Sequence, residues 1–173
     1  MRIETKRLLI TEFDMSMAEI VHKNSLDEDN RRFVPDEVFE TEEEAAETIE
    51  FLMSCYESGE GPLVYPVLLK SGENIGYVQF VPIEVEGNGD IKYEIGYHIA
   101  KDYTGNGYAA EAVQAFLPHM CKEKGVNKVF GICLAENVAS VHVLKKCGFA
   151  TEYTGVGEYQ GEAREIVRSV YTN

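Results

Sequence analysis

Two glycines at the start of a helical segment are the residues of this chain best suited to bind a phosphate. They are Gly105 and Gly107, in the stretch YTGNGYAAEA of residues 103–112. Backbone N–H groups at a helix N-terminus attract an anion, and glycines keep side chains out of its path. The stretch therefore predicts a binding site for a phosphate or a pyrophosphate.

The same glycines fit the dinucleotide pattern G-x-G-x-x-G/A, which gives a second interpretation. Glu136, after the next expected strand, could serve as the acid that binds a ribose. However, the preceding strand IKYEIGYHIA (91–100) alternates polar and apolar residues, whereas a first Rossmann strand is continuously apolar. Residues 101–104 also separate this strand from the glycines, and no βαβ unit precedes it. A dinucleotide-binding oxidoreductase is therefore the less favoured alternative.

The elements that must position these residues form an antiparallel meander followed by alternating helices and strands. The hydrophobic periodicity predicts helices near 16–24, 41–58, 108–122 and 137–147, with a loop over 25–40. It predicts strands near 6–13, 63–70, 74–83, 91–100, 127–134, 149–155 and 163–171. The short connections at 71–73 and 84–90 favour antiparallel pairing of the three strands that they join.

Two spaced motifs resemble the GNAT superfamily of N-acetyltransferases. They are YEIGYHIAKDYTGNGYAAEA (93–112) and Asn137-x-x-Ser140 continuing into VLKKCGF (143–149). Within the superfamily, the chain resembles the subgroup that acetylates N-terminal residues of ribosomal proteins. The resemblance implies one acetyltransferase domain over 1–173, of the α/β (α+β) class. Its sheet is expected to be mixed and mostly antiparallel, with six to seven strands and four flanking helices.

The resemblance also implies the cofactor, acetyl-CoA, and the residues that bind it. The pyrophosphate is expected on the main chain of 104–109, where Thr104 departs from the family's usual glutamine or arginine. The strand 91–100 is expected to splay from its parallel neighbour 127–134 and so open a slot for the pantetheine arm. The implied cofactor-binding residues are His98, Ile99, Ala100, Thr104, Gly105, Asn106, Gly107, Tyr108, Ala109, Ala110 and Asn137. Asn137 is also expected to cap the helix that follows it.

Glu94 and Ser140 are the predicted catalytic residues. An attacking amine must lose a proton, and Glu94 faces a partly dry sheet, where a carboxyl has a raised pKa that suits a general base. A role as an exposed sheet residue, or as an electrostatic anchor for the amine, stays open for Glu94. Ser140 resembles the serine near the CoA sulfur and could protonate the leaving thiolate, or it could only pack the helix. Many GNAT enzymes carry a tyrosine at the place of Leu144, and Tyr97 is interpreted as a packing residue.

The implied reaction moves the acetyl group of acetyl-CoA directly to a primary amine, on a protein N-terminus or a small molecule. The acceptor is expected to enter from the side of the first two helices. No metal is implied, and no cysteine has the spacing of a zinc site. A catalytically inactive acyl-CoA-binding or regulatory module is the alternative function.

The charge of the chain limits its partners. It has 30 acidic and 16 basic residues and a net charge of −14, which disfavours nucleic acid and anionic lipid and favours a cationic or neutral acceptor. Thirteen of the acids lie in 27–60, and they form either an acceptor face for an amine or a solvated helix face. With no long apolar run, the protein is expected to be cytoplasmic and away from membranes. Monomer and homodimer both stay open.

Overall fold

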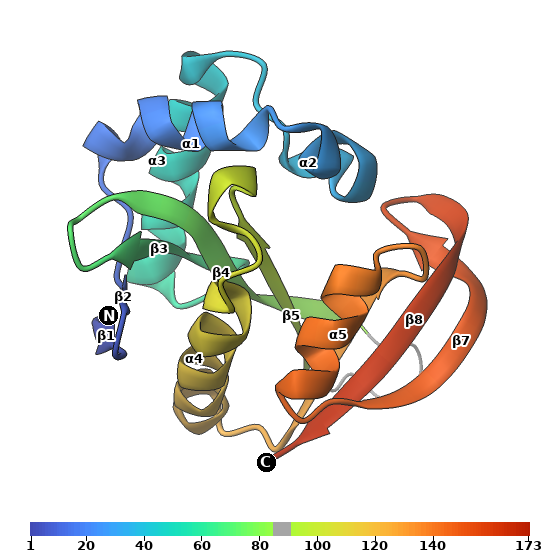
Figure 1. Cartoon of the computed structure of the whole chain (residues 1–173). Helices are drawn as coiled ribbons and strands as arrows, with labels where there is room; N and C mark the ends of the chain where they lie inside the picture. The colour runs from blue at the N-terminus through green and yellow to red at the C-terminus, as the bar shows by residue number, and fades with distance from the viewer. Residues whose placement is uncertain (85–90) are drawn as a thin grey trace.

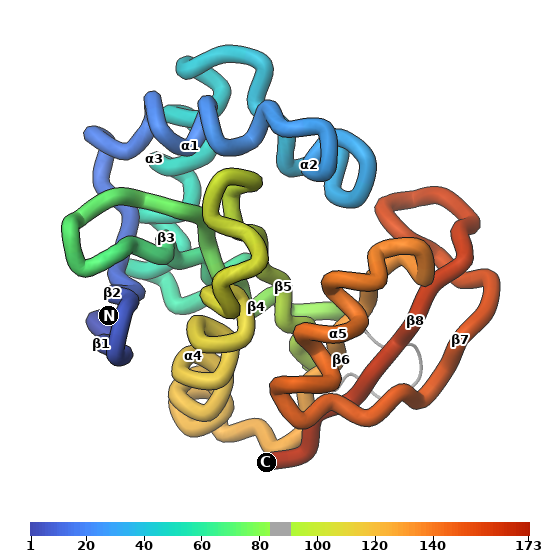
Figure 2. The backbone as a smooth tube through the Cα atoms, viewed as in Figure 1, coloured from blue at the N-terminus to red at the C-terminus, as the bar shows by residue number. Residues whose placement is uncertain are grey.

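A computed structural model describes residues 1–84 and 91–173 and contains one eight-stranded sheet (Figures 1 and 2). Its strand order is β1-β2-β3-β4-β5-β6-β8-β7, and β5 with β6 is a parallel pair whereas the other neighbours are antiparallel. The strands are β1 (Ile3–Glu4), β2 (Leu8–Ile10), β3 (Leu63–Leu69), β4 (Asn74–Glu84), β5 (Ile91–Ile99), β6 (Lys128–Leu134), β7 (Ala150–Tyr159) and β8 (Glu162–Thr172). The α-helices are α1 (Ala18–Ser25), α2 (Glu28–Phe33), α3 (Glu42–Ser58), α4 (Tyr108–Lys124) and α5 (Val138–Lys146).

The predicted mixed, mostly antiparallel fold is confirmed, with one strand and one helix more than the upper expected counts. The extra strand is β1, which lies before the expected strand 6–13 and is joined to β2 by a tight turn, where Thr5 and Leu8 exchange hydrogen bonds. The extra helix, α2, lies in the expected loop 25–40, where the Asp27 side chain caps it by accepting from Asn30 N–H at 2.7 Å. The connection expected at 84–90 lies, for 85–90, outside the described residues.

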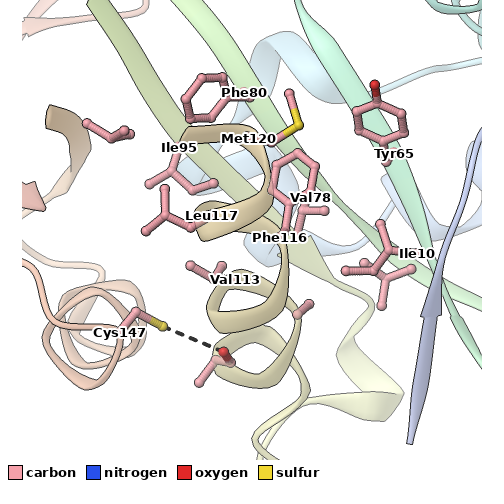
Figure 3. Packing of buried hydrophobic residues seen from close by; sticks show 14 of the residues in the cluster. Ile10, Tyr65, Val78, Phe80, Ile95, Val113, Phe116, Leu117, Met120 and Cys147 are labelled. Atoms are coloured by element: carbon pink, nitrogen blue, oxygen red, sulfur yellow. Dashed lines mark hydrogen bonds between the residues drawn. The ribbon is translucent and has the colours of Figure 1, made fainter. Parts of the chain in front are cut away.

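The helices cover both faces of the sheet. Helix α4 packs on one face, where Val113, Phe116, Leu117 and Met120 are fully or almost fully buried among strand residues such as Ile95 (Figure 3). The Cys147 thiol donates to the Ala110 carbonyl across 3.6 Å, which joins α5 to the start of α4. Helices α1 and α3 cover the other face around a second core of Phe13, Ala18, Ile49, Leu52 and Val64. The two faces of the central strands are therefore covered by different helices and belong to different hydrophobic cores.

None of the helices in residues 1–84 and 91–173 has the length and apolar character needed to cross a bilayer. The same residues contain no cluster of three or more His, Cys, Asp or Glu side chains arranged to hold a metal ion.

Candidate active site

The candidate site lies where β5 and β6 separate. The two strands pair in parallel at Glu94 and Phe130, and the described residues of β5 that follow Glu94 form no further bridge to β6. The Ala100 N–H donates to the Ile75 carbonyl at 2.8 Å, so alternate residues of β5 direct their backbone groups toward β4. The residues in between, Tyr97 and Ile99, direct theirs toward the open side. Pairing of β5 with β6 is therefore confined to Glu94 and Phe130 among the described residues, as the expected splay requires, and the backbone groups of Tyr97 and Ile99 lie along the edge that this leaves open.

The glycine loop forms an open helix N-terminus next to this splay. Gly105 and Gly107 have φ of +78° and +79°, the left-handed region that glycine adopts at little cost, and Gly107 is the N-cap of α4. The Asn106 side chain donates to the Tyr103 and Thr104 carbonyls at 3.0 and 3.2 Å and so holds the loop. The first N–H groups of any α-helix have no partner within the helix. The start of α4 therefore presents donors suited to an anion.

A cavity of about 460 Å³ connects the splayed strand with the glycine loop. Of the predicted cofactor-binding residues, those that line it are His98, Ile99, Thr104, Gly105, Gly107, Tyr108, Ala109, Ala110 and Asn137. Two predicted residues do not line it. The Ala100 carbonyl accepts from Tyr103 N–H at 2.9 Å and its N–H is bonded to β4, so neither group is free. The Asn106 carbonyl instead accepts from Arg7 at 2.9 Å.

Ser140 also lines this cavity and is held by two neighbours. Its N–H donates to Asn137 Oδ1 at 3.1 Å, which confirms the predicted cap of α5. Its hydroxyl lies 2.9 Å from the Tyr97 hydroxyl, which also donates to the Ser140 carbonyl at 3.0 Å. Burial raises the pKa of Tyr97, so its phenol keeps its proton at neutral pH. Tyr97 therefore does more than pack, because it fixes the hydroxyl of Ser140.

Glu94 lines a second, smaller cavity of about 220 Å³ that meets the first at Tyr97, Asn137 and Ser140. Burial raises the pKa of Glu94 to about 7, a backbone hydrogen bond from Ile132 lowers it, and the charge of Glu37 raises it. A carboxyl with a pKa near 7 can take up and release a proton at neutral pH. The structure thus brings the two predicted catalytic residues, Glu94 and Ser140, to the wall of one cavity.

Residues 7–150 match the acetyltransferase (GNAT) domain family. The chain belongs to the GNAT family of acetyltransferases. This confirms the resemblance inferred from the motifs at 93–112 and 137–149.

Individual relatives agree with this assignment. A Bacillus subtilis (strain 168) N-acetyltransferase, the uncharacterised YnaD, is 33% identical over 153 residues, which cover 88% of this chain and 84% of the relative. The crystal structure of a GNAT acetyltransferase from Bacillus anthracis has a TM-score of 0.80 at 28% identity and covers 99% of this chain and 98% of its own. RimL, a ribosomal-protein α-N-acetyltransferase solved with coenzyme A, has a TM-score of 0.82 with the same coverage. At 20% identity, RimL supports the fold alone.

Arg7 supports the GNAT glycine loop from far away in the chain, and the sequence contained no signal for this contact. Its Nε donates to Glu111 Oε2 at 2.6 Å, its Nη1 donates to the Asn106 carbonyl, and its guanidinium lies 4.5 Å from the centre of the Tyr108 ring. Glu111 also accepts from the Thr5 hydroxyl at 2.6 Å. Burial alone raises the pKa of Glu111, but these hydrogen bonds outweigh it and lower the pKa overall. The turn between β1 and β2 is therefore joined to the first turn of α4.

We expect Arg7→Ala to lower the free energy of unfolding by about 1–2 kcal/mol, because a half-buried carboxylate loses its charged donor. The change is at the lower end of such effects since 40% of the Arg7 side chain is exposed. Urea unfolding at pH 7 measures it. The control is Arg2→Ala, which removes an exposed arginine paired with Glu4 and should cost less than about 0.5 kcal/mol. Equal losses of unfolding free energy in the two variants would contradict a stabilising contact between Arg7 and the first turn of α4.

Proposed function

We propose that residues 1–173 act as one acetyltransferase domain that moves the acetyl group of acetyl-CoA directly to a primary amine. The acceptor amine is either a protein N-terminus or a small molecule. The observation that carries the proposal is the position of Glu94, with its pKa near 7, on the same cavity wall as Ser140. A base for the amine and a donor for the leaving group are what acetyl transfer to nitrogen requires.

The residues of the larger cavity fit acetyl-CoA. The N-terminal donors of α4 and the left-handed glycines suit a pyrophosphate, and Lys101 and Lys146 add positive charge to the lining of a chain that is strongly acidic overall. The free backbone groups of Tyr97 and Ile99 suit the amides of a long polar arm. The coenzyme A complex of RimL, which shares this fold, is consistent with that fit. We propose that the predicted lining residues bind the cofactor, without Ala100 and Asn106, which do not line this cavity.

The protein groups then have separate roles. Bound acetyl-CoA supplies an acetyl thioester. Glu94 accepts a proton from the ammonium form of the acceptor, and the N–H of Tyr97, directed to the open edge, suits a developing oxyanion. Ser140 Oγ–H donates a proton to the leaving sulfur and regains one from solvent, while the Tyr97 hydroxyl holds the Ser140 side chain in place. The N–C bond forms as the C–S bond breaks. Of the two protons that the ammonium loses, one balances the free thiol and the other passes to solvent.

A thiol-release assay tests the proposal. The protein is incubated with acetyl-CoA and, in separate reactions, with a small amine, a polyamine, an aminoglycoside and a peptide with a free N-terminus. We expect free thiol and an acetylated amine of matching amount, both dependent on the acceptor. Acetyl-CoA should also raise the melting temperature, since it binds only the folded protein. Thermal stabilisation by acetyl-CoA without amine-dependent thiol from any acceptor would instead indicate the inactive acyl-CoA-binding module.

A further inference from the structure

A third cavity lies on the α1 and α3 side of the sheet. It has a volume of about 280 Å³, and its apolar lining comes from Phe13, Val21, Phe39, Ile49, Leu52 and Val64. Phe51, which is 54% exposed, also lines it, so the cavity reaches solvent. For comparison, an apolar cavity of about 150 Å³ binds benzene. The space is therefore large enough for an aromatic ring with a short chain.

Glu37 lies between this cavity and the smaller cavity that Glu94 lines. Glu37 and Gln79 line both cavities, and Gln79 Nε2 donates to Glu37 Oε1 at 3.1 Å. Gly96, opposite Gln79 on β5, leaves room for that amide, because a Cβ at Gly96 would lie 2.3 Å from Gln79 Nε2. The second oxygen, Glu37 Oε2, is shielded from solvent and has no hydrogen-bond partner in the described structure. One carboxylate oxygen is therefore fixed and the other is left for a ligand.

The Glu37 carboxyl has no lysine or arginine partner among the described residues, 1–84 and 91–173. His98 also lines the cavity, but its Nε2 lies 3.4 Å from Asp27 Oδ2. Burying a carboxylate without a partner is costly, and an ammonium group at Oε2 would supply that partner. Burial raises the pKa of Glu37, so a cation at Oε2 would favour its charged form. The pocket thus combines a mostly apolar lining with a buried carboxyl that has no cationic partner in the described structure.

We propose that the acceptor is an arylalkyl primary amine, whose ring occupies the cavity between α1 and α3 and whose ammonium group pairs with Glu37. This assignment rests on the proposed acetyl transfer and names the substrate class of the same site. A polyamine would place further charges among apolar side chains, and a peptide would place unpaired amides there, both at a cost in desolvation. Glu37 binds the ammonium group in the position from which Glu94 takes its proton.

Isothermal titration calorimetry tests the assignment without turnover. The protein is saturated with CoA, which carries no acetyl group, and titrated with 2-phenylethylamine, ethylamine, spermidine or a peptide with N-terminal serine. We expect 2-phenylethylamine to bind at least about tenfold more tightly than each of the others, because only its ring fills the cavity. Glu37→Gln, which keeps the size of the side chain, should weaken 2-phenylethylamine about tenfold or more. Glu43→Gln, the same change at an exposed site on α3, should leave the affinity unchanged.

A second pair of variants tests the apolar part. Val21→Phe should weaken the binding of 2-phenylethylamine at least about fivefold and leave the affinity for ethylamine unchanged. The larger side chain would fill the apolar cavity, which only the phenyl ring of 2-phenylethylamine occupies. Val156→Phe adds the same ring at a side chain that is 61% exposed on β7 and should change neither affinity. The melting-temperature shift with acetyl-CoA shows that each variant is folded.

The outcomes separate this assignment from the proposed function. Unchanged 2-phenylethylamine affinity in Glu37→Gln, or tighter binding of spermidine or the peptide, overturns the assignment even if those amines are acetylated. Conversely, Glu37-dependent binding of 2-phenylethylamine with no thiol release from any amine supports the pocket and overturns the proposed catalysis.

Discussion

Glu94→Gln is expected to lower kcat at least about 100-fold, because a well-placed general base contributes about 10²–10⁴-fold. The KM for acetyl-CoA should change little, since Glu94 lines the smaller cavity and not the one with the glycine loop. Steady-state thiol release measures both constants. Glu165→Gln, the same change at an exposed position of β8, is the matched control and should retain full activity. Loss of less than about fivefold in kcat would remove Glu94 from the role of base.

The pKa of Glu94 fixes the direction of the pH dependence. Because the base acts in its deprotonated form, kcat of the wild type should rise with pH and level off above about 7. The contribution of Glu94 to the free energy of unfolding should instead fall as the pH rises. The folded pKa lies above the ordinary value of 4.5, so the stabilisation from protonated Glu94 is complete below about pH 4.5 and is lost as the pH rises through 7.

At pH 8, Glu94→Gln should therefore be more stable than the wild type, by up to roughly 3 kcal/mol from the size of the pKa shift. Urea unfolding at pH 5 and pH 8 measures this difference, which should shrink at the lower pH. Lower activity together with higher stability at pH 8 distinguishes a functional carboxylate from one that merely packs. A variant less stable than the wild type at both pH values would contradict the buried position of Glu94.

Gly107→Val is expected to weaken acetyl-CoA binding about 100-fold. A β-branched residue is strongly disfavoured at the φ of +79° that Gly107 adopts, so the loop must rearrange and its N–H groups no longer converge. Hydrogen bonds to a charged group are each worth about 1.5–3 kcal/mol, and the loss of one or two accounts for the factor. Titration calorimetry with CoA measures the affinity directly.

The same helix offers the control for this prediction. Gly125 is the C-cap of α4, has φ of +66° and has no atom within 4 Å of an added Cβ. Gly125→Val imposes a similar backbone strain at the other end of α4, so it should lower stability without a change in CoA affinity. If both variants lost affinity equally, strain in α4 rather than the glycine loop would be responsible.

The local features of the site could be predicted from the sequence. The glycine loop, the cap at Asn137 and the alternation that directs Glu94 to one face of β5 each depend on residues only a few positions apart. Backbone dihedrals, helix capping and strand periodicity are set at that range. The ends of most elements were predicted within a few residues for the same reason. The short strand β1 and the short helix α2 were missed because neither has a periodic pattern long enough to detect.

The sequence by itself therefore determined the class of fold, the family and the place of the phosphate-binding loop. Tertiary structure alone decided which side chains meet: Arg7 with Glu111, 104 residues away, Tyr97 with Ser140, 43 away, and Glu37 with Gln79, 42 away. It also separated the acids of 27–60, since the α3 glutamates are exposed, as a solvated helix face requires, whereas Glu37 Oε2 is shielded. The physical reason is that the burial and pairing of a side chain depend on segments that are distant in the sequence and meet only in the fold. The pattern of charges along the sequence does not show which segments these are.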